Sequence, residues 1–187
     1  MSHNEVESAG LIPWRAAHPS RWVRLNYHIV TACGRLSAIL FSLIAVIITY
    51  EVVARYVFHA PTIWAEDISL LCQIWATCLG ASWVLQHNAL IRIDILINHL
   101  GPTAARLAEG LALLVVAVFA CIVAFYGYEL VEESVVMGSA TASMLGLPLW
   151  ATKSAIPVGF GLLAVQAVSE LFLVFAGAER EREEISI

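Results

Sequence analysis

Four long stretches of the chain are almost free of charged residues, and each is about as long as a helix that crosses a membrane. They are residues 36–50 with an extension to Ala54, Ile68–Gln86, Gly110–Tyr128 and Ser154–Ala178. A helix needs about 20 apolar residues to span the hydrocarbon core of a bilayer. Only 13% of the 187 residues are charged, against about 25% in soluble domains. The sequence therefore predicts an integral membrane protein.

The four stretches are predicted to be helices, because a segment in lipid must satisfy its own backbone hydrogen bonds and four separate strands could not close a barrel. We expect an all-α membrane domain over residues 31–178, between a cytoplasmic N-terminal arm (1–30) and a charged cytoplasmic tail (179–187). Its four transmembrane helices are expected at about 33–57, 64–86, 107–129 and 150–176.

The fourth stretch is less uniform than the others. Pro157 lies near its start, and Gln166 and Glu170 lie further along. Proline interrupts the hydrogen bonding of a helix, and polar side chains within a span face protein rather than lipid. We therefore expect a kink or a late start in this helix, and a polar face turned toward the other helices.

The arginines predict the orientation. Positive residues are enriched in cytoplasmic loops. One side of the predicted membrane domain carries most of them: Arg15, Arg21, Arg24, Arg35, Arg92, Arg106, Arg180 and Arg182. The other side has only Arg55 and Lys153, together with Glu66, Asp67, Glu132 and Glu133. Both termini are therefore predicted to be cytoplasmic, in a protein that crosses the membrane several times.

The sequence contains no pattern that is typical of catalysis. All six histidines fall outside the predicted spans, which argues against a haem held between helices. The four cysteines lack a C-x-x-C spacing, and no G-x-S-x-G, H-E-x-x-H or P-loop motif occurs. We expect no catalytic residues, no metal, no cofactor and no nucleic-acid partner. The protein is not predicted to be an enzyme.

The connection after the first span concentrates charge at the outer face. Glu51 precedes Arg55 by four residues, which favours an ion pair on one side of a helix. This pair is either an interfacial ion pair or a contact to a partner subunit. Pro61 is expected to interrupt the helix, and Thr62 to cap the next one.

Three further residues belong to the predicted start of the second helix. Trp64 is expected to anchor it at the membrane interface, and Glu66 and Asp67 to complement the helix dipole in its first turns. One of these two acids is also expected to fold back over Arg55, since a lone charge near the hydrocarbon boundary is costly unless it is paired.

Residues 88–100 (NALIRIDILINHL) predict a short amphipathic helix at about 89–100, lying in the membrane interface between the second and third spans. On a helix, one side is apolar, Asp94 and Asn98 share a second side, and Arg92 and His99 share a third. The alternative is a cytoplasmic loop, which would expose many isoleucines.

Four short motifs follow one another through this part of the chain. They are E-x-x-x-R-Y-V-F at Glu51–Phe58, P-x-x-W-x-E-D at Pro61–Asp67, L-G-A at Leu79–Ala81 and H-x-x-x-I-R-I-D at His87–Asp94. In this order and spacing the sequence resembles the small membrane subunit (DctQ type) of tripartite ATP-independent periplasmic (TRAP) transporters. Asp67 stands where members of this family often have a second glutamate.

This resemblance implies a location in a bacterial inner membrane and a function. The chain would be a scaffold for a large polytopic membrane subunit that holds the substrate and sodium sites and moves as an elevator. It would also offer surface to a periplasmic substrate-binding protein, in sodium-driven uptake of an organic acid, and would contact membrane lipids. The candidate structural or partner-contact residues are Glu51, Arg55, Trp64, Glu66, Asp67, Arg92 and Asp94. The alternatives are a self-sufficient, homo-oligomeric exporter and a membrane enzyme or electron carrier.

Overall fold

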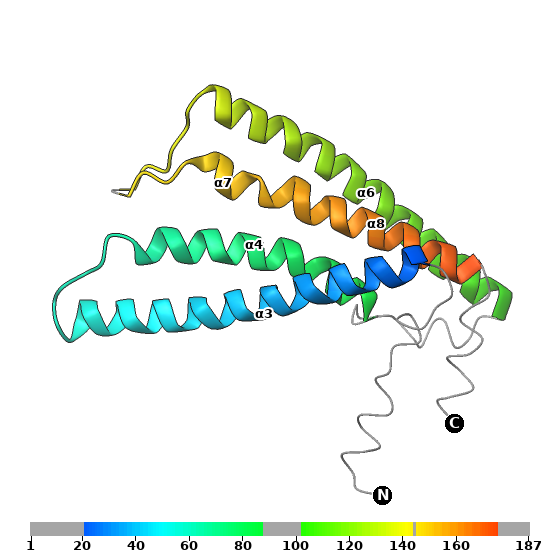
Figure 1. Ribbon diagram of the computed structural model, residues 1–187, viewed down its shortest axis with the longest axis horizontal. Coiled ribbons are helices and arrows are strands. Elements are labelled where there is room, and N and C mark those ends of the chain that lie inside the picture. Colours follow the sequence, from blue (N-terminus) through cyan, green and yellow to red (C-terminus); the bar gives the residue numbers. More distant parts are fainter. Residues whose placement is uncertain (1–20, 88–101, 144, 176–187) are drawn as a thin grey trace, which may run out of the picture.

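A computed structural model of the chain describes residues 21–87, 102–143 and 145–175, and these residues form helices joined by turns (Figure 1). The helices are α3 (Arg21–Tyr56), α4 (Ala65–Gln86), α6 (Pro102–Val136), α7 (Leu149–Lys153) and α8 (Ala155–Phe175). The described residues contain no strand, only an isolated bridge between Ala140 and Pro148. The predicted interfacial helix at 89–100, with Arg92 and Asp94, lies outside the described residues.

Four helical stretches are long and apolar enough to cross a membrane. They are Arg21–Tyr56, Ala65–Gln86, Leu107–Val136 and Leu149–Val174, the last of which combines α7 with most of α8. The all-α fold and the four spans are therefore confirmed. Two helices extend beyond the predicted spans: α3 begins at Arg21 rather than near residue 33, and α6 ends at Val136 rather than near residue 129. Charged residues end an apolar run, but arginine and glutamate are good helix formers, so the helix itself continues.

The helices pack in the order α3, α4, α8, α6. The three extensive contacts are α3 with α4, α4 with α8, and α8 with α6. Figure 1 shows two pairs, α3 with α4 and α6 with α7–α8. The α3–α4 and α6–α7 connections lie at the same end of the molecule, which we call the turn end. Thus α4 and α8 are the inner helices, and α3 and α6 each keep a broad exposed side.

Small residues let the inner helices approach closely. A Cβ atom added to Gly159 of α8 would lie 2.5 Å from the Cβ and 2.7 Å from the carbonyl oxygen of Cys78 in α4. Between α3 and α4, Ser37 Oγ donates a hydrogen bond to the carbonyl of Ala76 at 2.6 Å, beside Gly80. Membrane helices associate through such close contacts, because lipid supplies no hydrophobic force that drives them together.

The helical path is interrupted at Ser154, between α7 and α8. Three residues later comes Pro157, which has no N–H to donate to the carbonyl of Lys153 and whose ring crowds that carbonyl. The predicted irregularity near Pro157 is therefore confirmed.

The predicted polar face of the fourth span is also confirmed. Gln166, Ser169 and Glu170 are all buried. Asn26 Nδ2 of α3 donates hydrogen bonds to Gln166 Oε1 at 2.7 Å and to Ser169 Oγ at 3.2 Å, and Gln166 Nε2 donates to Glu170 Oε1 at 2.7 Å. This polar network ties the beginning of α3 to the last turns of α8, at the end of the molecule opposite the turn end.

Candidate partner-binding surface

Glu51 holds the turn between α3 and α4 together. Its Oε1 accepts hydrogen bonds from Arg55 Nη2 at 2.7 Å and Arg55 Nε at 3.0 Å, so the predicted i, i+4 ion pair is present. Its Oε2 accepts hydrogen bonds from the Thr62 N–H at 3.0 Å and from the Thr62 hydroxyl. The Glu51 side chain is only 11% exposed, whereas that of Arg55 is 52% exposed. Glu51 is therefore the centre of this contact, which we call the Glu51 knot.

The backbone of the turn contributes to its shape. His59 has a left-handed conformation with a φ of 51°, and the N–H of Ala60 donates to the carbonyl of Ala54 at 3.0 Å. This bond satisfies one of the carbonyls that the end of α3 leaves free. The chain thereby reverses and brings Thr62 back over Glu51.

The prediction that Thr62 caps α4 is wrong. The residue that precedes α4 is Trp64, and it makes no side-chain capping bond. The Thr62 hydroxyl donates to Glu51 instead, one turn before the end of α3. The competing acceptor is a carboxylate that is far away in sequence, and a local capping pattern carries no information about it.

The two acids at the start of α4 lie in its first turn, as predicted. Asp67 is not tied to Arg55, however, because its Oδ2 accepts a hydrogen bond from the Ser143 hydroxyl in the α6–α7 turn. Glu66 is exposed. The structure thus pairs Arg55 with Glu51 and uses Asp67 to join the two turns of the molecule.

The α6–α7 turn, residues 137–143 and 145–148, is held by its own hydrogen bonds. The Thr141 N–H donates to the Leu147 carbonyl at 2.8 Å, the Leu147 N–H donates to Thr141 Oγ1 at 2.9 Å, and the Leu149 N–H donates to the Ser139 carbonyl at 2.9 Å. This turn was not among the sites that the sequence predicted. Its local signals in the sequence are Gly138 and Gly146, both with a φ of 60°, and Pro148.

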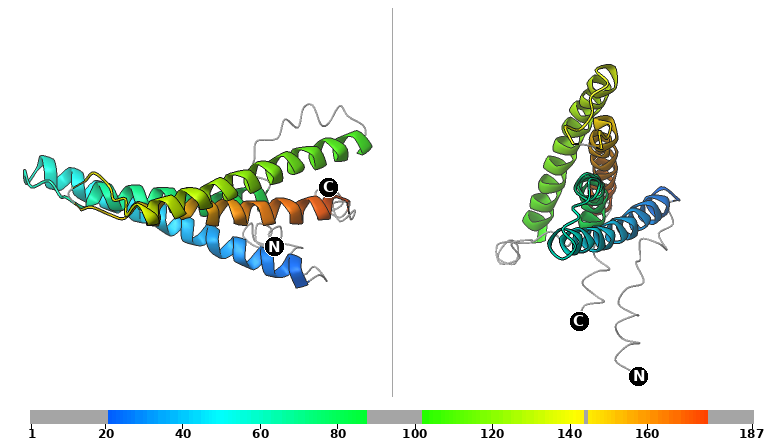
Figure 2. Two further views of the ribbon diagram at one scale, coloured as in Figure 1. Left: turned by 90° about the horizontal axis from the view of Figure 1, so that it is seen from above. Right: turned by 90° about the vertical axis from the view of Figure 1, so that its left-hand side faces the viewer.

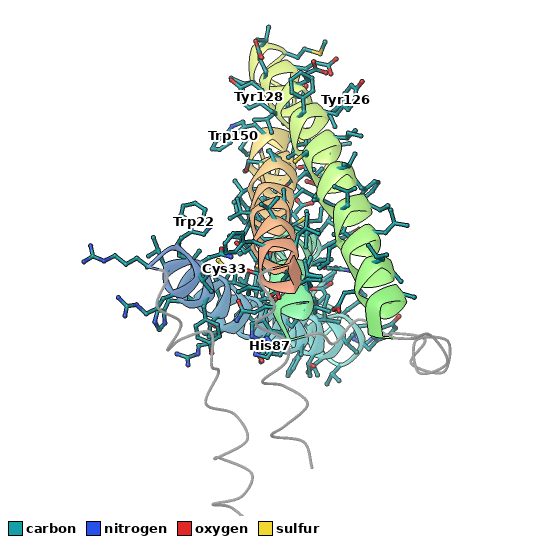
Figure 3. All side chains as sticks on the ribbon, turned by 90° about the vertical axis from the view of Figure 1, so that its right-hand side faces the viewer. Trp22, Cys33, His87, Tyr126, Tyr128 and Trp150 are labelled. Carbon is teal, nitrogen blue, oxygen red and sulfur yellow. The ribbon has the colours of Figure 1, made fainter. Side chains whose placement is uncertain are left out.

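Exposed aromatic residues surround the turn end. Figure 3 labels three exposed aromatic residues of this half of the molecule, Tyr126 and Tyr128 in the last third of α6 and Trp150 in α7. On the other pair of helices, the rings of Tyr50 and Trp64 stack with their centroids 6.1 Å apart. Tyrosine and tryptophan are enriched at membrane–water interfaces, so the turn end lies at one surface of the bilayer.

At the opposite end, His87 follows α4. The centroids of the His87 and Trp83 rings are 4.2 Å apart, and His87 Nδ1 is 3.0 Å from the Trp83 carbonyl oxygen. Trp83 in turn lies against Gly34 of α3, where an added Cβ would come within 2.2 Å of its ring.

An open apolar groove of about 930 Å³ lies between the two outer helices, with α4 and α8 behind it. Its lining includes Ser37, Phe41, Gly80, Trp83, Val115 and Phe119, and Arg35 stands at its edge. The outer helices are poorly covered by the rest of the chain. Of the most apolar 18-residue segment of each span, 17% is buried in α3 and 22% in the third span, against 39% in the fourth. The groove and these helix sides can contact lipid or another membrane protein.

Three curated proteins are similar in sequence to this chain. The C4-dicarboxylate TRAP transporter small permease protein DctQ of Rhodobacter capsulatus is 29% identical over 110 residues, which are 59% of this chain and 48% of that protein. The isethionate TRAP transporter permease protein DctMQ of Oleidesulfovibrio alaskensis is 24% identical over 156 residues, 80% of this chain and 24% of that protein. The sialic acid TRAP transporter permease protein SiaT of Haemophilus influenzae is 30% identical over 90 residues, 48% of this chain and 14% of that protein.

The match to this chain thus spans about half the length of the first relative and a quarter or less of the other two. The family described as tripartite ATP-independent periplasmic transporters, DctQ component, matches residues 44–177, which include the Glu51 knot, the groove-lining part of α4 and all of the α6–α7 turn. Since this match covers more than half of the 187 residues, the chain belongs to the DctQ component family of TRAP transporters.

Proposed function

We propose that this chain is the small permease subunit that supports a large, elevator-type membrane subunit during sodium-driven, binding-protein-dependent uptake of an organic acid. The observation that carries this proposal is membership of the DctQ family over residues 44–177. The relatives are named for C4-dicarboxylate, isethionate and sialic acid, all of which are organic anions at neutral pH. All three are named as permease proteins, which supports a transport role rather than a catalytic one.

The surface that we assign to the large subunit is the apolar groove. In the isethionate and sialic acid relatives, the matched part is 24% and 14% of one longer permease chain, so a DctQ-like part is continuous with the rest of a permease. The exposed side chains of Phe41, Val115 and Phe119 line the groove, so a partner helix can pack its own side chains between them, and such packing is what drives membrane helices together. The turn end, with the Glu51 knot and the Asp67–Ser143 contact, is the surface proposed for the periplasmic binding protein.

Reconstitution tests the function. The isolated chain in proteoliposomes should move no carboxylate under a sodium gradient, whereas the chain together with its large subunit and a loaded binding protein should do so. Sodium-driven uptake by the chain alone would refute the scaffold role and favour a self-sufficient exporter.

A pair of matched variants tests the groove in the same system. Val115 lines the groove, whereas Val118 is on the same helix, is similarly exposed and does not line it. Val115→Trp should reduce co-purification of the large subunit at least several-fold, because a bulky ring fills the space that the partner needs. Val118→Trp should leave co-purification of the large subunit unchanged. Equal effects of the two variants would show that the groove is not the contact surface.

We propose that both termini lie in the cytoplasm and that the turn end faces outside. Single cysteines would be placed in a background without the four native ones, at Ser2 and Ser186 and at two exposed turn-end positions, Ala60 and Ala142. An impermeant thiol reagent should label only Ala60→Cys and Ala142→Cys in intact cells. Labelling of Ser186→Cys from outside would contradict the proposed topology.

A further inference from the structure

The beginning of α3 carries a stripe of positive charge. Successive residues of an α-helix are 100° apart around its axis, which places Arg21, Arg24, His28 and Arg35 within about 60° of one another. All four residues are exposed. The buried residues of the same turns, Val23, Asn26 and Val30, lie on a different side and face the protein.

Beside the basic stripe runs an exposed apolar one. Trp22, Leu25, Ile29 and Leu36 also fall within about 60° of one another, and each is exposed, with Trp22 at 62%. Figure 3 shows Trp22 standing off the beginning of α3, where nitrogen-tipped side chains also extend from the helix. A basic face beside an apolar face that contains tryptophan is the pattern of a helix that lies in the headgroup region of a membrane.

The length of α3 places this segment at that depth. The 36 residues of α3 span about 54 Å, far more than the ~30 Å of the hydrocarbon core. A helix longer than the core is accommodated by tilting, and a tilt of about 40° lowers the height of α3 across the bilayer to about 41 Å, the thickness of the core with its headgroup regions. In this tilted orientation the turns from Arg21 to Arg35 lie along the headgroup region, with the apolar stripe toward the acyl chains. The left-hand view of Figure 2 shows this part of α3 (blue) standing away from α6.

We propose that residues Arg21–Arg35 form a binding site for anionic phospholipids, in which the three arginines and His28 contact headgroup phosphates and Trp22, Leu25, Ile29 and Leu36 contact acyl chains. The charge of the stripe complements an anionic headgroup, and the apolar stripe beside it suits a lipid better than an acidic protein surface, which would leave four large apolar side chains uncovered. The segment lies outside the family match at 44–177, so the proposal does not depend on the transport function.

Native mass spectrometry of the purified full chain tests this proposal, with phosphatidylglycerol or phosphatidylcholine titrated at low ionic strength. Wild type should bind phosphatidylglycerol more tightly than phosphatidylcholine. The triple variant Arg21→Gln, Arg24→Gln, Arg35→Gln should lose most of that preference, on the order of five-fold for each arginine. The control is the double variant Arg55→Gln, Lys153→Gln, which removes positive charge at the turn end. It should keep the preference for phosphatidylglycerol over phosphatidylcholine.

Two results would overturn the proposal. One is equal binding of the two lipids by wild type. The other is an unchanged phosphatidylglycerol preference in the triple variant, and if that variant also failed to co-purify the large subunit, the stripe would be a contact for an acidic surface of that subunit. Thermal unfolding without added lipid should be the same in the triple variant and wild type, because all three arginines are exposed and the buried face of the helix is unchanged.

Discussion

Gly159→Val is expected to destabilise the chain by about 3 kcal/mol or more and to lower its yield as a monodisperse protein in detergent. The added Cβ would lie 2.5 Å from the Cβ and 2.7 Å from the carbonyl oxygen of Cys78. Overpacking costs about 1–3 kcal/mol where side chains can adjust, and more where they cannot. Here part of the clash is with the backbone of α4, which can only relieve it by moving away from α8. Thermal unfolding followed by circular dichroism in detergent measures the loss.

The same helix supplies the control. A Cβ atom added to Gly161 would meet no heavy atom within 4 Å. Gly161→Val should therefore change the stability by less than about 0.5 kcal/mol, as is usual for substitutions outside a packed contact. If both variants unfolded at the same temperature, the close approach of α4 and α8 at Gly159 and Cys78 would not be needed for stability.

Glu51→Ala is expected to loosen the turn between α3 and α4 more than any other single substitution in that turn. It removes the acceptor of two hydrogen bonds from Arg55 and two from Thr62. The Thr62 N–H and hydroxyl then need other partners, and a donor left without one costs more than the bond was worth. The melting temperature in detergent should fall, and a cysteine at Ile63 should react faster with a thiol reagent.

Two variants separate the roles within the Glu51 knot. Arg55→Ala should have a smaller effect, because Glu51 keeps its bonds to Thr62 and the Arg55 side chain is already 52% exposed. Glu51→Gln retains one acceptor for the Thr62 N–H but turns an NH₂ donor toward the Arg55 guanidinium, so its stability should fall between those of wild type and Glu51→Ala. A larger loss in Arg55→Ala than in Glu51→Ala would show that the arginine, and not the glutamate, organises the turn.

The interactions that the sequence predicted correctly are those that depend on neighbours along one helix. The Glu51–Arg55 pair follows from an i, i+4 spacing, and Glu66 and Asp67 lie in the first turn of α4 because residue order alone places them there. The irregularity near Pro157 has an equally local cause. Arg92 and Asp94 stay predictions, since they lie outside the described residues.

The amino-acid sequence by itself determined the all-α fold, the four membrane spans and the family, because hydropathy, helical period and motif spacing can be read along the chain. Only the tertiary structure decided the order α3, α4, α8, α6, the groove between the outer helices, and the partners of Thr62 and Asp67. Asp67 meets Ser143, and Gly159 meets Cys78, across long stretches of sequence. Contacts of this kind depend on which helix faces pack together. An apolar span is hydrophobic on all sides, so its sequence does not show which face will contact which neighbouring helix.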